Sequence, residues 1–338
     1  MLIYIDRFNW MEGMVKIALL IILILSTFSI ATLIIFFITH SNLIDGISNV
    51  GIKNFYLSVA PQSSRLIGLM ENPNTFAYLL LYSFYIYVFL IIYFKNSKLK
   101  YLFSILLIFN VINLILTASR GALLSFLISL IFFCCCILIL FRITNHEHYH
   151  ILKIAFISLA ILGFLFLIYA FSFNSEFALS VREFLIKNLL RLNGLKTGSG
   201  RTNNWKVALS MDKSKYIFGV NDEYMYNRMV ELLPKRSSSF INNNGRYHNM
   251  YITLLVNYGI FALLGFLYFL VYSLKVFVKG YFVSSFRRKR FVLIFISQFF
   301  AILVSGIFEQ LPIFNLSPHA LLFMFCWSSL FVLSNRDR

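Results

Sequence analysis

Long apolar stretches, almost free of charge, recur along the whole chain and limit the folds that it can adopt. Only 13% of the 338 residues are charged and 59% are hydrophobic, whereas soluble domains carry about 25% charged residues. A bilayer-spanning helix needs about 20 apolar residues and satisfies its own backbone hydrogen bonds. We therefore expect an all-α polytopic membrane helix bundle. The eight predicted spans are 16–39, 74–94, 100–118, 121–141, 151–172, 250–273, 291–308 and 315–334.

The net charge of +17 follows this membrane pattern. Every second short connection is basic: 95–100, 142–153 and 274–290, the last with the run Arg287-Arg288-Lys289-Arg290. Lysine and arginine concentrate in cytoplasmic loops. We therefore expect both termini in the cytoplasm. The predicted outward-facing segments are 40–73, the tight connection at Ser119-Arg120, 173–249 and 309–314.

The segment 173–249 is the longest predicted outer loop, and it has too few apolar stretches to form a core of its own. It contains one plausible helix, because apolar residues from Trp205 to Met211 follow Arg201 at helical spacing. Arg201 and Trp205 are four residues apart and would share one face. We therefore treat 1–338 as a single integral membrane domain whose long periplasmic loop carries part of the functional site.

Two arginines and one histidine stand at the predicted outer edge. Arg120 lies between two apolar spans, where an unpaired guanidinium is costly, and its planar donors match phosphate oxygens. Arg201 lies in the polar loop, in Gly200-Arg201-Thr202. His248 precedes the next span and could accept a proton near neutral pH. The alternatives are a lipid-headgroup anchor at Arg120, an ordinary surface arginine at Arg201, and a helix-capping histidine at His248.

The predicted spans themselves carry few polar groups, namely Asn110, Asn113 and Gln298. Ion-coupled transporters place ionisable groups inside the membrane, so this pattern disfavours an ion-driven pump. We expect neither a metal nor a cofactor, because the cysteines lack metal-ligand spacing. The cysteines are Cys134, Cys135, Cys136 and Cys326. The histidines His146, His148 and His150 are spaced like metal ligands, but they fall in a basic inner loop that is expected to be solvated. His319 is a second candidate, after His248, for a functional histidine on the outer side.

Five short segments, in this order, are similar to motifs of one known family. They are Thr117–Leu124, Gly200-Arg201 with Trp205, Ile217–Val220, His248–Tyr251 and Tyr258-Gly259-Ile260. Together with the long outer loop, they resemble the O-antigen ligase and O-antigen polymerase superfamily of bacterial envelope polysaccharide assembly. That family usually has about a dozen spans. On this resemblance the chain is expected to be a shortened member that lacks some N-terminal spans.

The resemblance implies metal-independent glycosyl transfer at the periplasmic face of the bacterial inner membrane. The donor would be a glycan on undecaprenyl diphosphate, and the acceptor a glycan or lipid A-core, as in lipopolysaccharide biosynthesis. By motif, Arg120 and Arg201 would bind the diphosphate, and His248 would activate the acceptor hydroxyl. The expected supporting residues are Arg65, Asn72, Arg191, Trp205, Asn249 and Glu309. Ligase and polymerase activities stay open, as do a lipid-linked oligosaccharide flippase and an inactive member.

Overall fold

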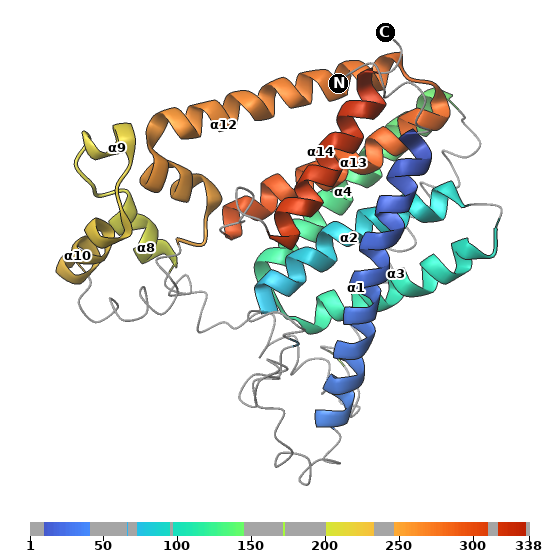
Figure 1. Ribbon diagram of the computed structural model, residues 1–338, viewed down its shortest axis with the longest axis horizontal. Helices are drawn as coiled ribbons and strands as arrows, with labels where there is room; N and C mark the ends of the chain where they lie inside the picture. Colours follow the sequence, from blue (N-terminus) through green and yellow to red (C-terminus); the bar gives the residue numbers. More distant parts are fainter. Residues whose placement is uncertain are drawn as a thin grey trace. The chain divides into compact units, whose positions relative to one another are not determined.

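All regular structure among the described residues of the computed structural model is helical (Figure 1). Those residues are 10–40, 66, 73–94, 97–144, 172, 201–232, 247–309 and 317–335. The helices are α1 (Trp10–His40), α2 (Pro73–Tyr93), α3 (Leu99–Leu116), α4 (Arg120–Thr144), α8 (Arg201–Ala208), α9 (Lys215–Phe218), α10 (Asp222–Leu232), α12 (Met250–Val283), α13 (Phe286–Phe308) and α14 (Pro318–Asn335).

Six of these helices are long and apolar enough to cross a bilayer, so the chain is a multi-pass membrane protein. Their apolar parts are Met11–Ala31, Pro73–Tyr93, Leu99–Leu116, Arg120–Arg142, Met250–Val283 and Arg288–Phe308. They confirm six of the eight predicted spans. The eighth corresponds to α14, whose apolar part Pro318–Ser334 is shorter. The predicted span 151–172 lies outside the described residues except for Ser172.

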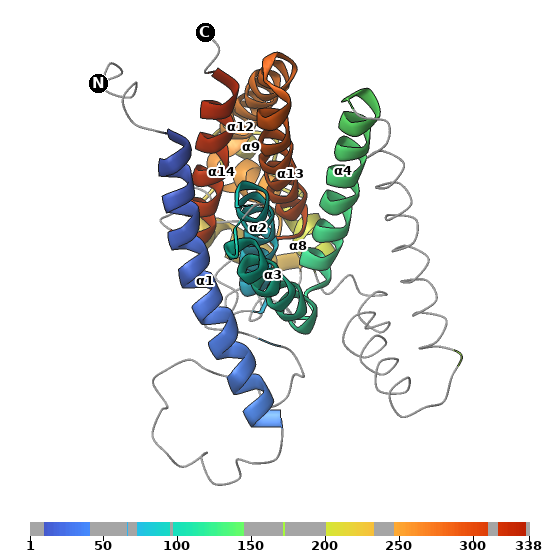
Figure 2. The same ribbon diagram turned by 90° about the vertical axis from the view of Figure 1, so that its right-hand side faces the viewer.

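Two compact units divide the chain: Met1–Leu192 with Leu293–Gln298, and Asn193–Val292 with Phe299–Arg338. In the first unit α2 is the central helix. In its most apolar stretch 78% of the residues are buried, against 22% in α3 and in α4. Helices α1, α3 and α4 pack against it, and Figure 2 shows α2 and α3 side by side.

Polar side chains tie the neighbouring elements of the first unit to α2. Ser26 of α1 shares a 2.8 Å hydrogen bond with the Tyr87 hydroxyl. Asn110 of α3 donates to Leu80 O at 2.9 Å, and Gln298 donates to Tyr82 O at 3.2 Å. Since a bilayer offers no water to satisfy such groups, they favour helix association. Two of the three polar exceptions in the spans are therefore explained by packing against α2.

The connection between α3 and α4 is as tight as the sequence predicted. Ala118 has a φ of +47°, in the left-handed region that ends many helices. Thr117 then accepts a 3.3 Å hydrogen bond from Ser119 N through its hydroxyl, while that hydroxyl donates to Leu114 O at 2.7 Å. The turn places Arg120 at the first residue of α4.

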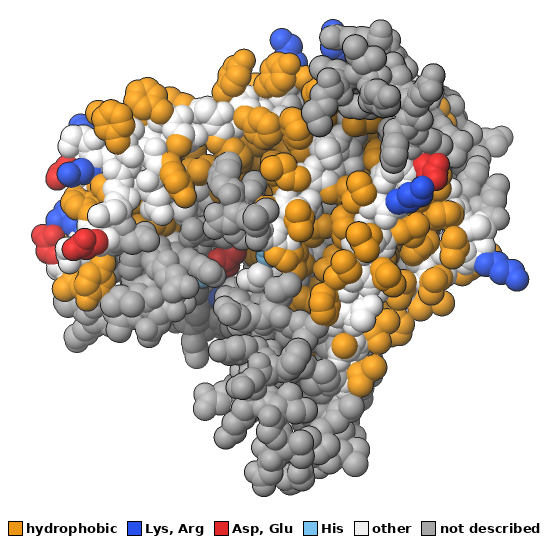
Figure 3. Space-filling model, viewed as in Figure 1, with side chains coloured by type: hydrophobic (Ala, Val, Ile, Leu, Met, Phe, Trp, Pro, Cys, Tyr) orange, Lys and Arg blue, Asp and Glu red, His pale blue; other side chains and the backbone are white. Residues whose placement is uncertain are grey.

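In the second unit α12 is the longest helix, and it is broken near its start. Gly259 has φ +84° and ψ 178°, so residues 250–258 form a separate short helical piece. Farther along, α12 packs against α14, where a Cβ at Gly280 would lie 2.3 Å from Ser334 Cβ. Figure 3 shows apolar side chains along α12 and charged side chains gathered over α9 and α10, as expected for a lipid-facing helix beside a polar segment.

The break in α12 is the docking site of the chain that leaves α9. Val220 N donates to Val256 O at 2.8 Å. Gly219 has a φ of +78°, and a Cβ there would lie 2.6 Å from the Asn257 carbonyl. A Cβ at Gly259 would lie 2.3 Å from Ile217 O. Figure 1 shows α9 beside the start of α12. Two of the family-like motifs, Ile217–Val220 and Tyr258-Gly259-Ile260, therefore contact each other through their backbones.

The predicted helix after Arg201 is confirmed as α8, and the structure adds two helices that the sequence did not predict. Helices α9 and α10 follow α8, and their side chains share a small core with the start of α12. That core consists of Val207, Ala208, Met211, Met225, Tyr247 and Val256. Helix α12 contributes Val256 to this core. The composition of 173–249 alone therefore could not predict it.

Candidate active site

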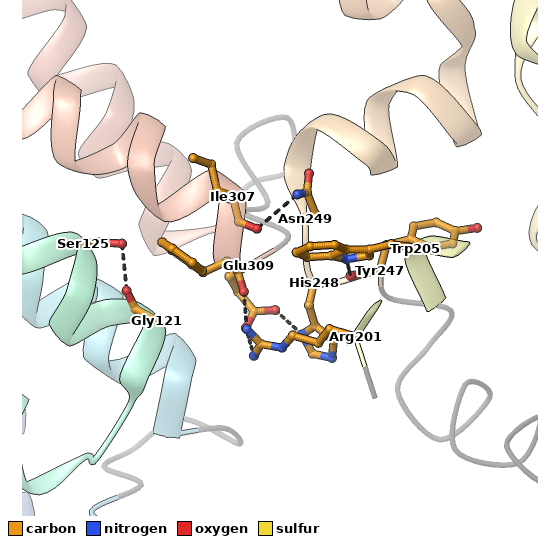
Figure 4. Close-up of polar contacts among 10 residues, drawn as sticks. Gly121, Ser125, Arg201, Trp205, Tyr247, His248, Asn249, Ile307 and Glu309 are labelled. Carbon is orange, nitrogen blue, oxygen red and sulfur yellow. Dashed lines mark hydrogen bonds and ion pairs between the residues drawn. The ribbon is translucent and has the colours of Figure 1, made fainter. Parts of the chain in front are cut away.

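A carboxylate at the C-terminal end of α13 lies between a histidine and an arginine (Figure 4). Glu309 Oε1 is 2.6 Å from His248 Nδ1, and Glu309 Oε2 is 3.5 Å from Arg201 Nη2. Arg201 Nη1 also donates to Phe308 O at 2.6 Å. The side chains of Glu309, His248 and Arg201 are 9%, 16% and 25% exposed. This Arg201–Glu309–His248 cluster lies wholly in the second unit and is mostly screened from solvent.

The backbone around His248 is held on both sides. Before it, Tyr247 O accepts a 2.7 Å hydrogen bond from Trp205 Nε1. After it, Asn249 caps α12 by accepting from Ile252 N at 3.0 Å, and its amide donates to Ile307 O at 3.1 Å. Asn249 thus joins the start of α12 to the end of α13, the two places that supply His248 and Glu309.

His248 itself has a φ of +52°. Residues other than glycine seldom adopt this left-handed conformation, although histidine, asparagine and aspartate do so more often than most. The conformation costs about 1–2 kcal/mol. Such strain persists only where the surroundings impose it, and it is frequent at functional sites. We infer that the turn is kept for the direction it gives the imidazole.

Arg201 and Trp205 reach the same region from successive turns of α8. Arg201 contacts Phe308 and Glu309, while Trp205 holds Tyr247. This agrees with the prediction that Arg201 and Trp205 share one face of the helix. Val207 and Ala208, at the end of α8, are buried in the small core with Val256. The guanidinium of Arg201 is therefore fixed by a helix that is itself anchored to α12.

The chemistry of the cluster follows from its donors and acceptors. An ionised carboxylate only accepts hydrogen bonds, so the contact with Glu309 requires the proton of a neutral His248 to be on Nδ1. Nε2 then keeps its lone pair and can take a proton from a hydroxyl. Arg201 offers a fixed positive charge beside it. The arrangement can deprotonate an alcohol and bind an anion at one place.

Arg228 shows what an ordinary surface arginine looks like in the same unit. Its Nη1 donates to Glu231 Oε2 at 2.7 Å, three residues farther along α10. That hydrogen bond raises the pKa of Arg228 above its usual value. The pair lies within one helix and its Glu231 side chain is 63% exposed, whereas Arg201 contacts a 9% exposed carboxylate at the end of a distant helix. The surface-arginine interpretation therefore fits Arg228 and not Arg201.

The other predicted site residues divide into three groups. Arg120 is the first residue of α4 in the first unit, after the left-handed Ala118. Trp205 and Asn249 support the backbone around His248. Outside the described residues lie Arg65, Asn72 and Arg191, together with His146, His148 and His150. Among the residues that the structure describes, no three histidine, cysteine, aspartate or glutamate side chains group as metal ligands.

Glu309 is the residue whose importance the sequence understated, since it was predicted only as a supporting residue. One signal was present: the chain has only 13 acidic residues, and Glu309 directly follows an apolar span. Ionisable groups at such positions are often functional. His248 and Arg201 are far from Glu309 in the sequence, His248 being 61 residues earlier, so no local pattern identifies these contacts.

These features define a class: a multi-pass helical membrane protein with a histidine, a carboxylate and an arginine clustered at the ends of its helices. Residues 105–267 match the family model described as O-antigen ligase. This match confirms the resemblance of the segment to the O-antigen ligase and polymerase superfamily. No curated protein and no solved structure matches the chain.

The family match supports glycosyl transfer in polysaccharide assembly as the general activity. The matched segment contains Arg120, Arg201 and His248, as well as both glycines of the α9–α12 contact. Glu309 lies beyond it. The family match and the geometry therefore reach the same part of the chain by independent routes, and the geometry adds the carboxylate.

Proposed function

We propose that this protein transfers a glycan from undecaprenyl diphosphate to an acceptor hydroxyl at the periplasmic face of the inner membrane, without a metal ion. The observation that carries the proposal is the single carboxylate of Glu309 between His248 and Arg201. Glu309 joins a proton acceptor to a cation. Glycan transfer from a diphosphate requires both, because the acceptor hydroxyl must lose a proton and the leaving diphosphate must be stabilised. The orientation of the site toward the periplasm follows from the charge pattern of the loops.

In the proposed reaction the acceptor hydroxyl oxygen attacks the anomeric carbon of the donor sugar. The bond between that carbon and the phosphate oxygen breaks, and the electron pair leaves with the diphosphate. The hydroxyl proton passes to His248 Nε2. Glu309 holds the ring through Nδ1 and stabilises the imidazolium that forms, as the carboxylate does in catalytic triads.

The leaving group is an anion, so its developing charge has to be stabilised. Arg201 supplies a guanidinium next to the base, and such preplaced charges act without reorganisation during the reaction. Arg120 is assigned to the same diphosphate from its sequence motif and from the fork of donors that arginine presents to phosphate oxygens. Two guanidinium groups would take the part that Mg²⁺ plays in sugar-nucleotide enzymes.

The acceptor decides between ligase and polymerase activity, and it is tested by complementation. The chain is expressed in a strain lacking its O-antigen ligase and in one lacking its polymerase. Restored attachment to lipid A-core in the first strain identifies a ligase, and a restored ladder of chain lengths in the second identifies a polymerase. Restored activity in neither strain, with the protein present in the membrane, argues against both.

Matched variants test the site within the complementing strain. Arg201→Ala is expected to abolish the polysaccharide, and Arg228→Ala, an arginine of the same unit paired on α10, is expected to leave it unchanged. His248→Asn removes the base but keeps a residue suited to the left-handed backbone. Normal polysaccharide from His248→Asn would exclude the proposed mechanism. Immunoblots of the membrane fraction verify equal protein amounts.

A further inference from the structure

Phe218, the last residue of α9, is 83% exposed, more than any other large apolar side chain among the described residues. Its neighbour Ile217 is exposed as well. Both belong to a helix of four residues, which is too short to cross a bilayer, so their exposure is not that of a span. Large apolar groups gathered on a surface mark a place of contact with a membrane or with another protein.

Helix α9 touches α12 where the exposed apolar face of that helix begins. A Cβ at Gly259 would lie 2.9 Å from the carbonyl carbon of Phe218. On the α12 side of this contact Tyr258 and Phe261 are exposed. The exposed face then continues along α12 at helical spacing through Leu264, Tyr268 and Val271. Since α12 is long and apolar enough to cross a bilayer, this face is in contact with lipid.

The length of α12 places the contact with α9 at the edge of the bilayer. The helix has 34 residues, about 50 Å at 1.5 Å per residue, whereas the hydrocarbon core is about 30 Å thick. Its two charged residues, Lys275 and Lys279, lie 16 and 20 residues beyond Gly259, which is about 24–30 Å along the helix. A crossing that ends near these lysines therefore begins near Gly259, at the depth where aromatic residues gather in membrane proteins.

We propose that α9 is an interfacial membrane anchor: Phe218 and Ile217 insert among lipids at the boundary of headgroups and acyl chains, beside the start of the α12 crossing. Lys213 and Lys215, which precede them, are exposed, and lysines at this depth extend toward headgroup phosphates. The ligand is the bilayer lipid itself. Another protein or a second copy of this chain could also cover an apolar surface, but neither would require that surface to lie at the start of the crossing.

The anchor acts on α8 through direct contacts. The Tyr216 hydroxyl of α9 donates to the carbonyl oxygen of Ala208, the last residue of α8, at 3.2 Å. Tyr216 also packs against the small core that contains Val207. Lipid around Phe218 therefore fixes the depth of α8, whose first residue is Arg201. The benefit to Arg201 rests on the proposed function, because a diphosphate on a lipid lies at the membrane surface, but the anchor itself does not.

The test uses the full-length chain in vesicles of phosphatidylcholine and phosphatidylglycerol, with bromine on the acyl chains either close to the headgroup or close to the chain end. Bromine quenches tryptophan on contact, and the fluorescence of Phe218→Trp minus that of the wild type isolates the new indole. Shallow bromine should quench it more than deep bromine, because interfacial groups lie about 5–10 Å into the boundary of headgroups and acyl chains. An indole that neither bromine quenches would overturn the proposal.

Three further substitutions of exposed residues set the scale. Tyr268→Trp, nine residues beyond Gly259 and so near the middle of the crossing, should be quenched more by deep bromine. Asn227→Trp, on the charged helix α10, should be quenched by neither, and equal quenching at positions 218 and 227 would refute insertion of α9 in particular. Tyr258→Trp lies on the other side of the contact and should match Phe218→Trp. It decides the question if Phe218→Trp does not fold, since no quenching there would also refute the anchor.

Failure of the anchor and failure of the proposed function give different results, because quenching requires no substrate. If neither Phe218→Trp nor Tyr258→Trp is quenched while the wild type transfers glycan and His248→Asn does not, the anchor is wrong and the function stands. If both indoles are quenched as expected but His248→Asn still transfers glycan, the anchor stands and the proposed function is wrong.

Discussion

Gly259→Ala should open the contact between α9 and the broken start of α12. The new Cβ would lie 2.3 Å from Ile217 O and 2.8 Å from Ile217 C, both backbone atoms that cannot rotate away. The φ of +84° with ψ of 178° lies in a region open almost only to glycine, and another residue there costs about 1–3 kcal/mol. Loss of the Val220–Val256 hydrogen bond adds about 1 kcal/mol.

The sum is about 2–4 kcal/mol, or roughly a 30- to 700-fold rise in the population of the opened segment. Gly265→Ala is the matched control on the same helix, since a Cβ there meets nothing within 4 Å. Alanine in place of a helical glycine should stabilise by about 0.5–1 kcal/mol. The two variants therefore differ in the sign of their effect.

Limited proteolysis of the chain in detergent measures the opening, because cleavage tracks the open population when opening and closing are fast. Gly259→Ala should be cut within 201–232 much faster than the wild type, and Gly265→Ala no faster. Transfer should fall with it, since α8 carries Arg201 and shares its core with Val256. Equal protease resistance of the two variants would refute the docking role of Gly259.

Three further outcomes are expected. Arg120→Ala should lower transfer about 100- to 1000-fold, as the loss of one transition-state donor does, with membrane insertion intact; normal transfer would remove this arginine from the diphosphate site. Chelator should leave transfer unchanged, and inhibition that magnesium reverses would contradict the metal-free reaction. Asn249→Ala should lower the melting temperature more than Asn249→Asp, because aspartate still caps Ile252 N, a contact worth about 1 kcal/mol; equal losses would mean that the cap contributes nothing.

The spans could be predicted because each depends on its own composition. A stretch such as 74–94 is apolar throughout and needs no partner to be recognised, and it became α2 within one residue at each end. The helix after Arg201 was likewise predictable from the spacing of Trp205 and Ala208. The basic run Arg287-Arg288-Lys289-Arg290 after α12 could also be recognised from the local sequence alone.

The break in α12 could not be predicted in this way. Gly259 lies within a long apolar run, and only the chain that docks on it from Ile217 to Val220 explains the break. Helices α9 and α10 were missed for the same reason, because their core includes Val256 of α12. A pattern within one segment does not contain the surface that another segment supplies.

The site shows the same division between single residues and their contacts. Arg201 and His248 were predicted from their chemistry and their positions at the membrane edge. That one carboxylate contacts both was not predictable, because the three residues come from the start of α8, the turn before α12 and the end of α13. The turn at Asn249 and its bond to Ile307 bring those ends together.

The left-handed backbone at His248 leads to a final prediction, in which stability follows the reverse of its usual order. The variants His248→Ala, His248→Gly and His248→Asn all lose the contact with Glu309, so they differ mainly in the cost of a φ of +52°. Alanine bears the full penalty of about 1–2 kcal/mol, while glycine avoids it. His248→Gly and His248→Asn should therefore melt at a higher temperature than His248→Ala, although glycine normally destabilises a chain relative to alanine. If His248→Ala proved the most stable of the three, the turn would not be strained, and the imidazole would owe its direction to Glu309 alone.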